Sequence, residues 1–119
     1  MYNILFIDSS ERLYNQLTSV EDPDIQNLYY AKEINDIHEI IKQHNIDIVV
    51  SDITLEGMSL FPILKQITEY NSRMPIVIYT SNSARDNVVS AANIGAAGYM
   101  LKPMDTTQLL PKIKKLITK

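Results

Sequence analysis

The sequence contains no cysteine, which excludes disulfide bonds, thiolate catalysis and zinc sites built from cysteine. Its N-terminal residues form neither a basic leader nor an apolar run long enough for a signal peptide or a membrane span. Positive charge is also scarce: the formal net charge is -3, and affinity for a nucleic-acid backbone depends on clustered Lys and Arg. We therefore expect a cytoplasmic protein that contacts neither a membrane nor a nucleic acid.

The composition that remains is typical of a folded protein. Hydrophobic residues make up 45% and charged residues 21% of the 119 residues, and we find no repeat, linker or low-complexity tract. A chain of this length buries roughly two-thirds of its unfolded surface around one core. We expect a single domain over residues 1–119.

Short apolar segments alternate along the chain with segments of helical periodicity. The apolar segments, which predict strands, are 4–7, 28–31, 46–51, 75–80 and 98–101. Apolar residues three to four apart predict helices over 13–20, 34–41, 60–67, 85–94 and from 109 to the C-terminus. Pro62 would be tolerated only in the first turn of its helix. The chain therefore alternates five predicted strands with five predicted helices.

This alternation predicts an α/β fold with a parallel five-stranded sheet, because parallel strands need helical crossovers. For five units we predict a doubly wound, flavodoxin-like (βα)5 arrangement with strand order 2-1-3-4-5 and helices on both faces. Ligands bind such sheets at the carboxyl ends of the strands, beside the switch point between the first and third strands. The residues at those ends are Asp8, Asp52, Thr80, Ser81 and Lys102.

Two carboxylates, a hydroxyl and an ammonium at one sheet edge suit a divalent metal and a phosphoryl group. Magnesium prefers one or two carboxylates together with substrate oxygens and water. A lysine supplies a point charge for phosphate, and a hydroxyl donates to another of its oxygens. A carboxylate can itself be the nucleophile and form an acyl phosphate.

Two motifs resemble the receiver domains of bacterial two-component response regulators of the chemotaxis-regulator kind. They are Val49-Val50-Ser51-Asp52 and Gly95-Ala96-Ala97-Gly98-Tyr99-Met100-Leu101-Lys102-Pro103, and the likeness covers nearly the whole chain. The resemblance identifies Asp52 as the phosphoacceptor of a phosphoprotein. It also implies that the peptide bond between Lys102 and Pro103 is cis and directs the lysine inward.

The resemblance further implies magnesium bound by Asp8, Asp52 and the backbone carbonyl of Thr54. Asp52 would take a phosphoryl group from a histidine kinase or a phosphotransfer protein, while Lys102 and Thr80 stabilise the transferred oxygens. No conventional enzyme activity is implied beyond self-phosphorylation from a phosphodonor and autodephosphorylation. The partner on the output side would be a downstream protein or an output domain, and the resemblance also allows a homodimer.

The same resemblance assigns a switch to Thr80 and Tyr99. The aromatic side chain would turn inward when the hydroxyl is drawn toward the phosphoryl group, and the helix at 85–94, the strand at Tyr99 and the last helix would then present a changed surface. Thr54 and Asn82 occupy positions that tune how fast the phosphoryl group is lost.

The sequence departs from the family pattern at three places. Ser9 stands where the family has a second acid, Glu56 where it often has proline, and Ser59-Leu60 where it often has Asp-Gly. Loss of a carboxylate about 4 Å from a divalent ion forfeits several kcal/mol of gross attraction, so metal affinity should fall. Ser9 itself, Glu11 and Glu56 are the candidates to replace that ligand.

Three alternatives remain open from the sequence. The first is a pseudo-receiver, a protein-interaction module of the same fold that works without phosphorylation because Ser9 and Glu56 have abolished the chemistry. The second is a flavin carrier, which Asp8 and Glu11 disfavour because acids would face the flavin phosphate. The third is that the chain is part of a longer regulator or of a hybrid kinase.

Overall fold

The structure is a computed structural model and describes residues 1–117. Its main strands are β1 (Tyr2–Ile7), β2 (Ile25–Ala31), β3 (Ile48–Ser51), β6 (Ile76–Thr80) and β7 (Gly98–Leu101), and a small hairpin is formed by β4 (Thr54–Leu55) and β5 (Met58–Ser59). The helices are α1 (Glu11–Thr18), α2 (Ile34–Gln43), α3 (Phe61–Tyr70), α4 (Arg85–Asn93) and α5 (Thr106–Ile117).

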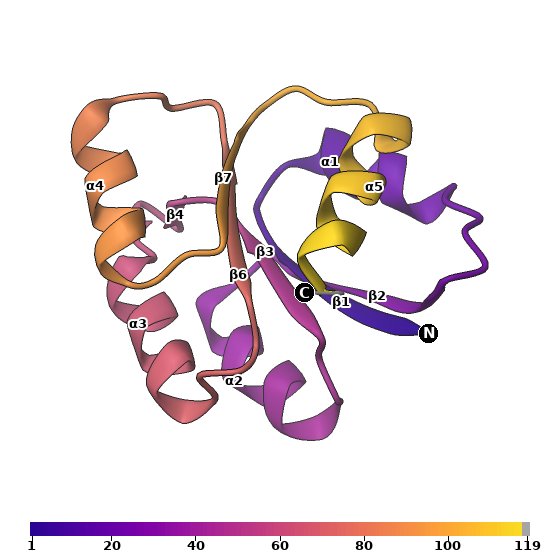
Figure 1. Ribbon diagram of the computed structural model, residues 1–119, viewed down its shortest axis with the longest axis horizontal. Coiled ribbons are helices and arrows are strands. Elements are labelled where there is room, and N and C mark those ends of the chain that lie inside the picture. Colours follow the sequence, from indigo (N-terminus) through magenta and orange to yellow (C-terminus); the bar gives the residue numbers. More distant parts are fainter. Residues whose placement is uncertain (118–119) are drawn as a thin grey trace.

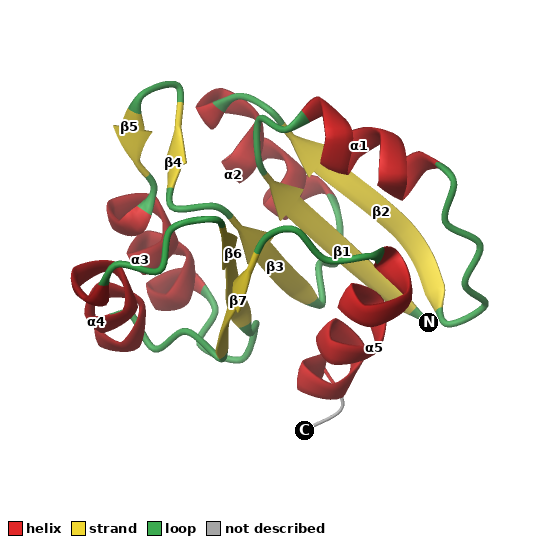
Figure 2. Ribbon diagram, turned by 90° about the horizontal axis from the view of Figure 1, so that it is seen from above, coloured by secondary structure: helices red, strands yellow, loops and turns green. Residues whose placement is uncertain are grey.

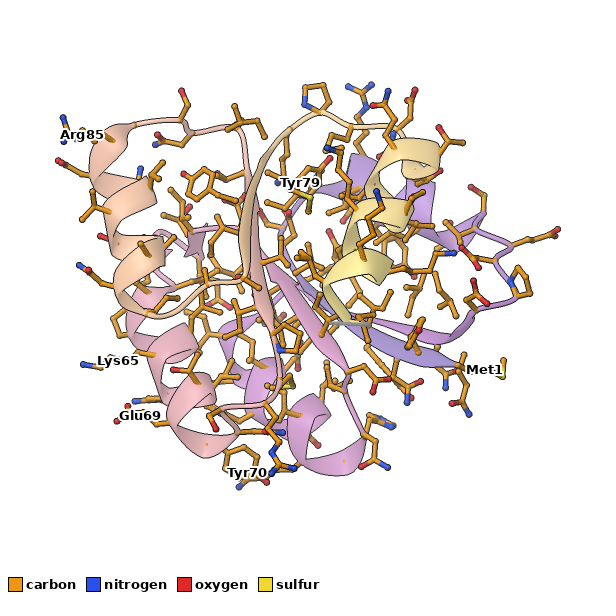
Figure 3. All side chains as sticks on the ribbon, viewed as in Figure 1. Met1, Lys65, Glu69, Tyr70, Tyr79 and Arg85 are labelled. Atoms are coloured by element: carbon orange, nitrogen blue, oxygen red, sulfur yellow. The ribbon has the colours of Figure 1, made fainter. Side chains whose placement is uncertain are left out.

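The five main strands form one parallel sheet in the order β2-β1-β3-β6-β7. This is the predicted 2-1-3-4-5 order, so the predicted doubly wound fold is confirmed. Consecutive strands run parallel because a helix carries the chain back between them. The carboxyl ends of the strands lie at the top of Figure 1. In Figure 3, which has the same view, Arg85 marks the start of α4 near this end and Tyr70 marks the end of α3 at the bottom.

Helices cover both faces of the sheet, with α1 and α5 on one face and α2, α3 and α4 on the other (Figures 1 and 2). Successive strand residues point to opposite faces, so β1 contributes to two cores. Leu5 and Ile7 pack with Leu64 on one side, whereas Ile4 and Phe6 pack with helix residues such as Leu109 on the other. The continuous apolar run of β1 is therefore buried on both faces, as a central parallel strand requires.

The structure differs from the sequence prediction mainly at the element boundaries. Strand β2 begins at Ile25, earlier than predicted, and the β4–β5 hairpin was not predicted at all. Pro62 does lie in the first turn of its helix. The predicted run of the last helix to the C-terminus includes residues 118–119, which lie outside the described residues. Within 1–117, no helix combines the length and the hydropathy needed to span a bilayer.

Candidate functional site

The sheet ladder brings the ends of β1 and β3 together at the carboxyl edge. Ile7 pairs with Ser51, and the backbone N–H of Asp52 donates to the carbonyl of Ile7 at 2.9 Å. The N–H of Asp8 donates to the carbonyl of Ala31 at 3.1 Å. These backbone bonds fix Asp8 and Asp52 as neighbours just beyond their strands, at the predicted switch point.

Lys102 reaches this point from the end of β7, the edge strand opposite β2. Its backbone N–H donates to the carbonyl of Thr80 at 2.9 Å, and its peptide bond to Pro103 is cis, as the resemblance implies. Its Nζ lies 2.6 Å from Oδ2 of Asp8 and 2.9 Å from Oδ2 of Asp52. One ammonium group thus bridges both carboxylates.

Both carboxylates are well supplied with donors. The other oxygen of Asp8 accepts from the N–H of Ser10 at 3.0 Å, and the other oxygen of Asp52 accepts from the N–H of Ile53 at 2.7 Å. Ser10 in turn caps α1. Asp8 is 2% exposed, whereas the side chains of Asp52 and Lys102 remain 21% and 19% exposed. The cluster is therefore open to solvent on the Asp52 side.

The charges at this edge stabilise one another. Burial acts to lower the pKa of Lys102, but hydrogen bonds to Asp8 and then Asp52, together with their negative charges, outweigh it and raise that pKa above its ordinary value. Lys102 is therefore a permanent cation at neutral pH. The three side chains together carry one net negative charge.

The carboxylates at this edge are of the type that magnesium prefers. The Oδ2 atoms of Asp8 and Asp52 both point toward Nζ of Lys102, at 2.6 Å and 2.9 Å, so the two acids converge on one point where a divalent ion would fit. Two carboxylates, a carbonyl and water suffice for magnesium. Among residues 1–117 no group of three or more His, Cys, Asp or Glu side chains is arranged to hold a metal, so a site here would depend on these two acids.

The candidate replacements for the second acid are otherwise engaged. Glu11 pairs with Lys32 at 3.2 Å. Oε1 of Glu56 accepts from the backbone N–H of Ile34 at 2.9 Å, at the start of α2. Ser9 lies exposed next to Asp8 and carries no charge. In this arrangement neither glutamate is directed at the metal position.

The two residues assigned to the switch meet at Asn82. The Oγ1 atom of Thr80, which is buried, accepts from the N–H of Asn82 at 3.3 Å. The hydroxyl of Tyr99 donates to the carbonyl of Asn82 at 2.6 Å. Burial first, and then the charge of Asp52, raise the pKa of Tyr99. The loop after β6 therefore links the end of that strand to the aromatic ring on β7.

Two tyrosines near the site were not singled out from the sequence. The hydroxyl of Tyr79 accepts from the N–H of Met104 at 2.9 Å, and its ring centroid lies 5.6 Å from Nζ of Lys102 (Tyr79 is labelled in Figure 3). The hydroxyl of Tyr30 donates to the carbonyl of Ser10 at 2.7 Å. The sequence feature that could have identified them is a tyrosine within an apolar strand, because a buried tyrosine hydroxyl usually has a hydrogen-bond partner.

Comparison with known families agrees with this architecture. The sequence profile described as response regulator receiver domain matches residues 4–114. The DNA-binding transcriptional regulator NtrC of Klebsiella pneumoniae is 31% identical over 84 residues, which are 71% of this chain but 18% of that protein. The chain thus spans less than a fifth of the length of that relative.

One shorter relative and one solved structure match over nearly their full length. Protein PilH of Pseudomonas aeruginosa is 27% identical over 119 residues, covering 98% of both chains. A crystal structure of a two-component response regulator from Clostridium difficile superposes with a TM-score of 0.88 at 22% identity, covering 100% of this chain and 98% of that one. The structural match concerns the fold.

Proposed function

Because this chain belongs to the response regulator receiver domain family, we propose that it accepts a phosphoryl group on Asp52 from a histidine kinase or a phosphotransfer protein. The observation that carries the proposal is the bridge from Lys102 to Asp8 and Asp52 at the switch point of the sheet. A buried acid, a partly exposed acid and a fixed cation at one sheet edge are the groups that acyl phosphate formation needs.

In the proposed reaction, one carboxylate oxygen of Asp52 attacks the phosphorus of a phosphohistidine. The new P–O bond forms while the P–N bond breaks, and the bond electrons leave with the imidazole of the donor. Asp8, Asp52 and the Thr54 carbonyl would hold magnesium, which when bound offsets the negative charge of the phosphoryl oxygens. Lys102 balances the remaining charge and Thr80 donates a hydrogen bond.

The proposed output is a change of surface at the end of β6 and along β7. Movement of Thr80 toward the phosphoryl group would disturb its bond from Asn82, and with it the bond from Tyr99 to the same residue. The partner would be a downstream protein, an output domain or a second copy of the chain. We place this signalling in the cytoplasm.

Intact-mass analysis after incubation with magnesium and acetyl phosphate tests the proposal. We expect one added phosphoryl group in the parent protein and none in Asp52→Asn, which keeps the side-chain shape and removes the nucleophile. An equal gain of mass in both proteins would exclude Asp52 as the acceptor. No gain in either, together with no binding of beryllofluoride, would contradict a working receiver.

A second candidate is a pseudo-receiver that binds a partner without phosphorylation. It is favoured by exposed Ser9 in place of the second acid, and by the engagement of Glu11 and Glu56 elsewhere. Thermal unfolding with and without magnesium helps to separate the candidates, because a ligand that binds the native state raises the midpoint. The pseudo-receiver predicts no shift at millimolar metal and no gain of mass with acetyl phosphate.

A further inference from the structure

Glu56 occupies a backbone conformation that glutamate seldom adopts. It forms, with Gly57, the two-residue turn between β4 and β5, and the φ angles of these two residues are 53° and 75°. Positive φ at both positions is what a tight hairpin turn with the right-handed twist of its strands requires, and Asn-Gly is the preferred pair there. A glutamate at the first position is strained, so some other interaction must hold it.

The side chain of Glu56 supplies that interaction. Its Oε1 accepts from the N–H of Ile34, the first residue of α2, at 2.9 Å and across 22 residues of sequence. Within the described chain, the N-cap residue Glu33 makes no capping hydrogen bond with its own side chain. The carboxylate from the hairpin therefore caps α2, where the helix dipole favours negative charge.

The hairpin lies directly after the proposed phosphoacceptor. Its base is closed by the N–H of Leu60, which donates to the carbonyl of Ile53 at 2.8 Å, and Leu55 is buried in the core. Its tip is tied down by Glu56, and Figure 2 shows the hairpin projecting beyond the end of the five-stranded sheet. Thr54 lies between these two anchors.

We propose that Glu56 is a positioning residue: its bond to α2 fixes the segment from Asp52 to Ser59 and so holds the Thr54 carbonyl where a metal ion can use it. The inference rests on the proposed function, since it concerns the metal site at Asp52. Such help is needed here because Ser9 leaves only Asp8 and Asp52 as acidic ligands. A glutamate that could have replaced the missing ligand acts instead on the loop that carries the third one.

Two variants separate the bond from the turn. Glu56→Gln keeps an acceptor of the same length, whereas Glu56→Asn creates the preferred Asn-Gly turn and withdraws the acceptor by one methylene. We expect Glu56→Asn to weaken magnesium binding about fivefold, the equivalent of one net hydrogen bond, and Glu56→Gln to stay within about twofold of the parent. The affinity is measured by titrating magnesium while following backbone amide signals of residues 52–59.

Amide signals without metal test the contact itself. The Ile34 amide proton should shift and exchange faster in Glu56→Asn but not in Glu56→Gln, and amides of the hairpin should lose protection with it. An unchanged Ile34 amide in Glu56→Asn would overturn the inference. So would a variant of lowered thermal stability whose magnesium affinity is unchanged, because Glu56 would then be a helix cap and nothing more.

Failure of the proposed function looks different. If the parent protein binds no magnesium and gains no phosphoryl group, the metal role of the site is wrong, and with it the role of Glu56 in the metal site. The Ile34 and hairpin amides would still decide whether Glu56 orders the loop. The two failures therefore give distinct patterns.

Discussion

Replacing Lys102 with methionine should destabilise the fold in the absence of metal. Methionine keeps a long apolar side chain but removes the ammonium that lies 2.6 Å from Asp8 and 2.9 Å from Asp52. The two carboxylates would then face each other without a counter-ion. Asp8 is almost completely buried, so solvent can do little to compensate for its charge.

The magnitude follows from the burial of the three groups. Removing one partner of a buried ion pair destabilises a protein by about 3–5 kcal/mol, because an unpaired charge stays inside. The lower end applies, since about a fifth of the Asp52 and Lys102 side chains is exposed, and we expect about 3 kcal/mol. For 119 residues, with an unfolding entropy of about 2.1 cal/mol/K per residue, that lowers the melting temperature by about 12 °C.

Denaturant unfolding of the parent and Lys102→Met in EDTA measures this difference. Asp8→Asn combined with Lys102→Met is the control, because it removes the buried charge and should recover much of the lost stability. Magnesium should also recover part of it in Lys102→Met, since a metal ion can share the same two carboxylates. A loss below about 1 kcal/mol, typical of exposed pairs, or a double variant no more stable than the single one, would refute the reasoning.

Two further predictions concern other charges. Ser9→Asp should tighten magnesium binding by at least about tenfold, and the neutral Ser9→Asn should not, because only the acid restores a charge about 4 Å from the metal; isothermal titration calorimetry of the two variants checks this. At the other end of the molecule, Lys114 on α5 bonds to Asp22 at 2.9 Å, which lowers the pKa of Asp22 below 3.8 and raises the pKa of Lys114 above 10.5. The difference in stability between the parent and Lys114→Met should therefore be constant between about pH 5 and 9 and shrink as pH falls below 3.8 or rises above 10.5. Thermal unfolding at several pH values measures this difference, and a difference as large at about pH 2 as at about pH 7 would contradict the prediction.

Apolar patterning was sufficient to predict the sheet. Buried parallel strands such as β1 and β3 contain continuous apolar runs, and the helices between them follow the 3.6-residue period, so the element types could be predicted. The strand order then followed from the usual doubly wound arrangement of five such units. The same patterning predicts the ends of edge strands poorly, because their residues are partly exposed. Strand β2 contains Gln26 and Asn27, which are exposed at the sheet edge, and its first residues were therefore missed.

The location of Asp8, Asp52 and Lys102 could be predicted because parallel strands bring their carboxyl ends to one edge. The detailed contacts could not. The hydrogen bond between Glu56 and Ile34 joins residues that are 22 apart in the sequence. It also depends on a turn in which Glu56 has a positive φ angle, a conformation that a glutamate does not predict. Glu56 had been a candidate to replace the acid missing at Ser9, whereas the structure directs its carboxylate to the N–H of Ile34 at the start of α2.

The charge at the carboxyl edge explains why weak metal binding alone would not favour the pseudo-receiver. Asp8, Asp52 and Lys102 carry one net negative charge, so a divalent ion would leave the edge with one net positive charge. The acyl phosphate carries about -1.5 to -2 in place of the single negative charge of the Asp52 carboxylate, so phosphorylation adds up to about one negative charge, which such an edge favours. Metal and phosphoryl group should therefore bind more tightly together than the metal does alone, because each offsets the charge of the other. The effect of losing the second acid at Ser9 is therefore better measured by the magnesium affinity in the presence of beryllofluoride than by the magnesium affinity alone.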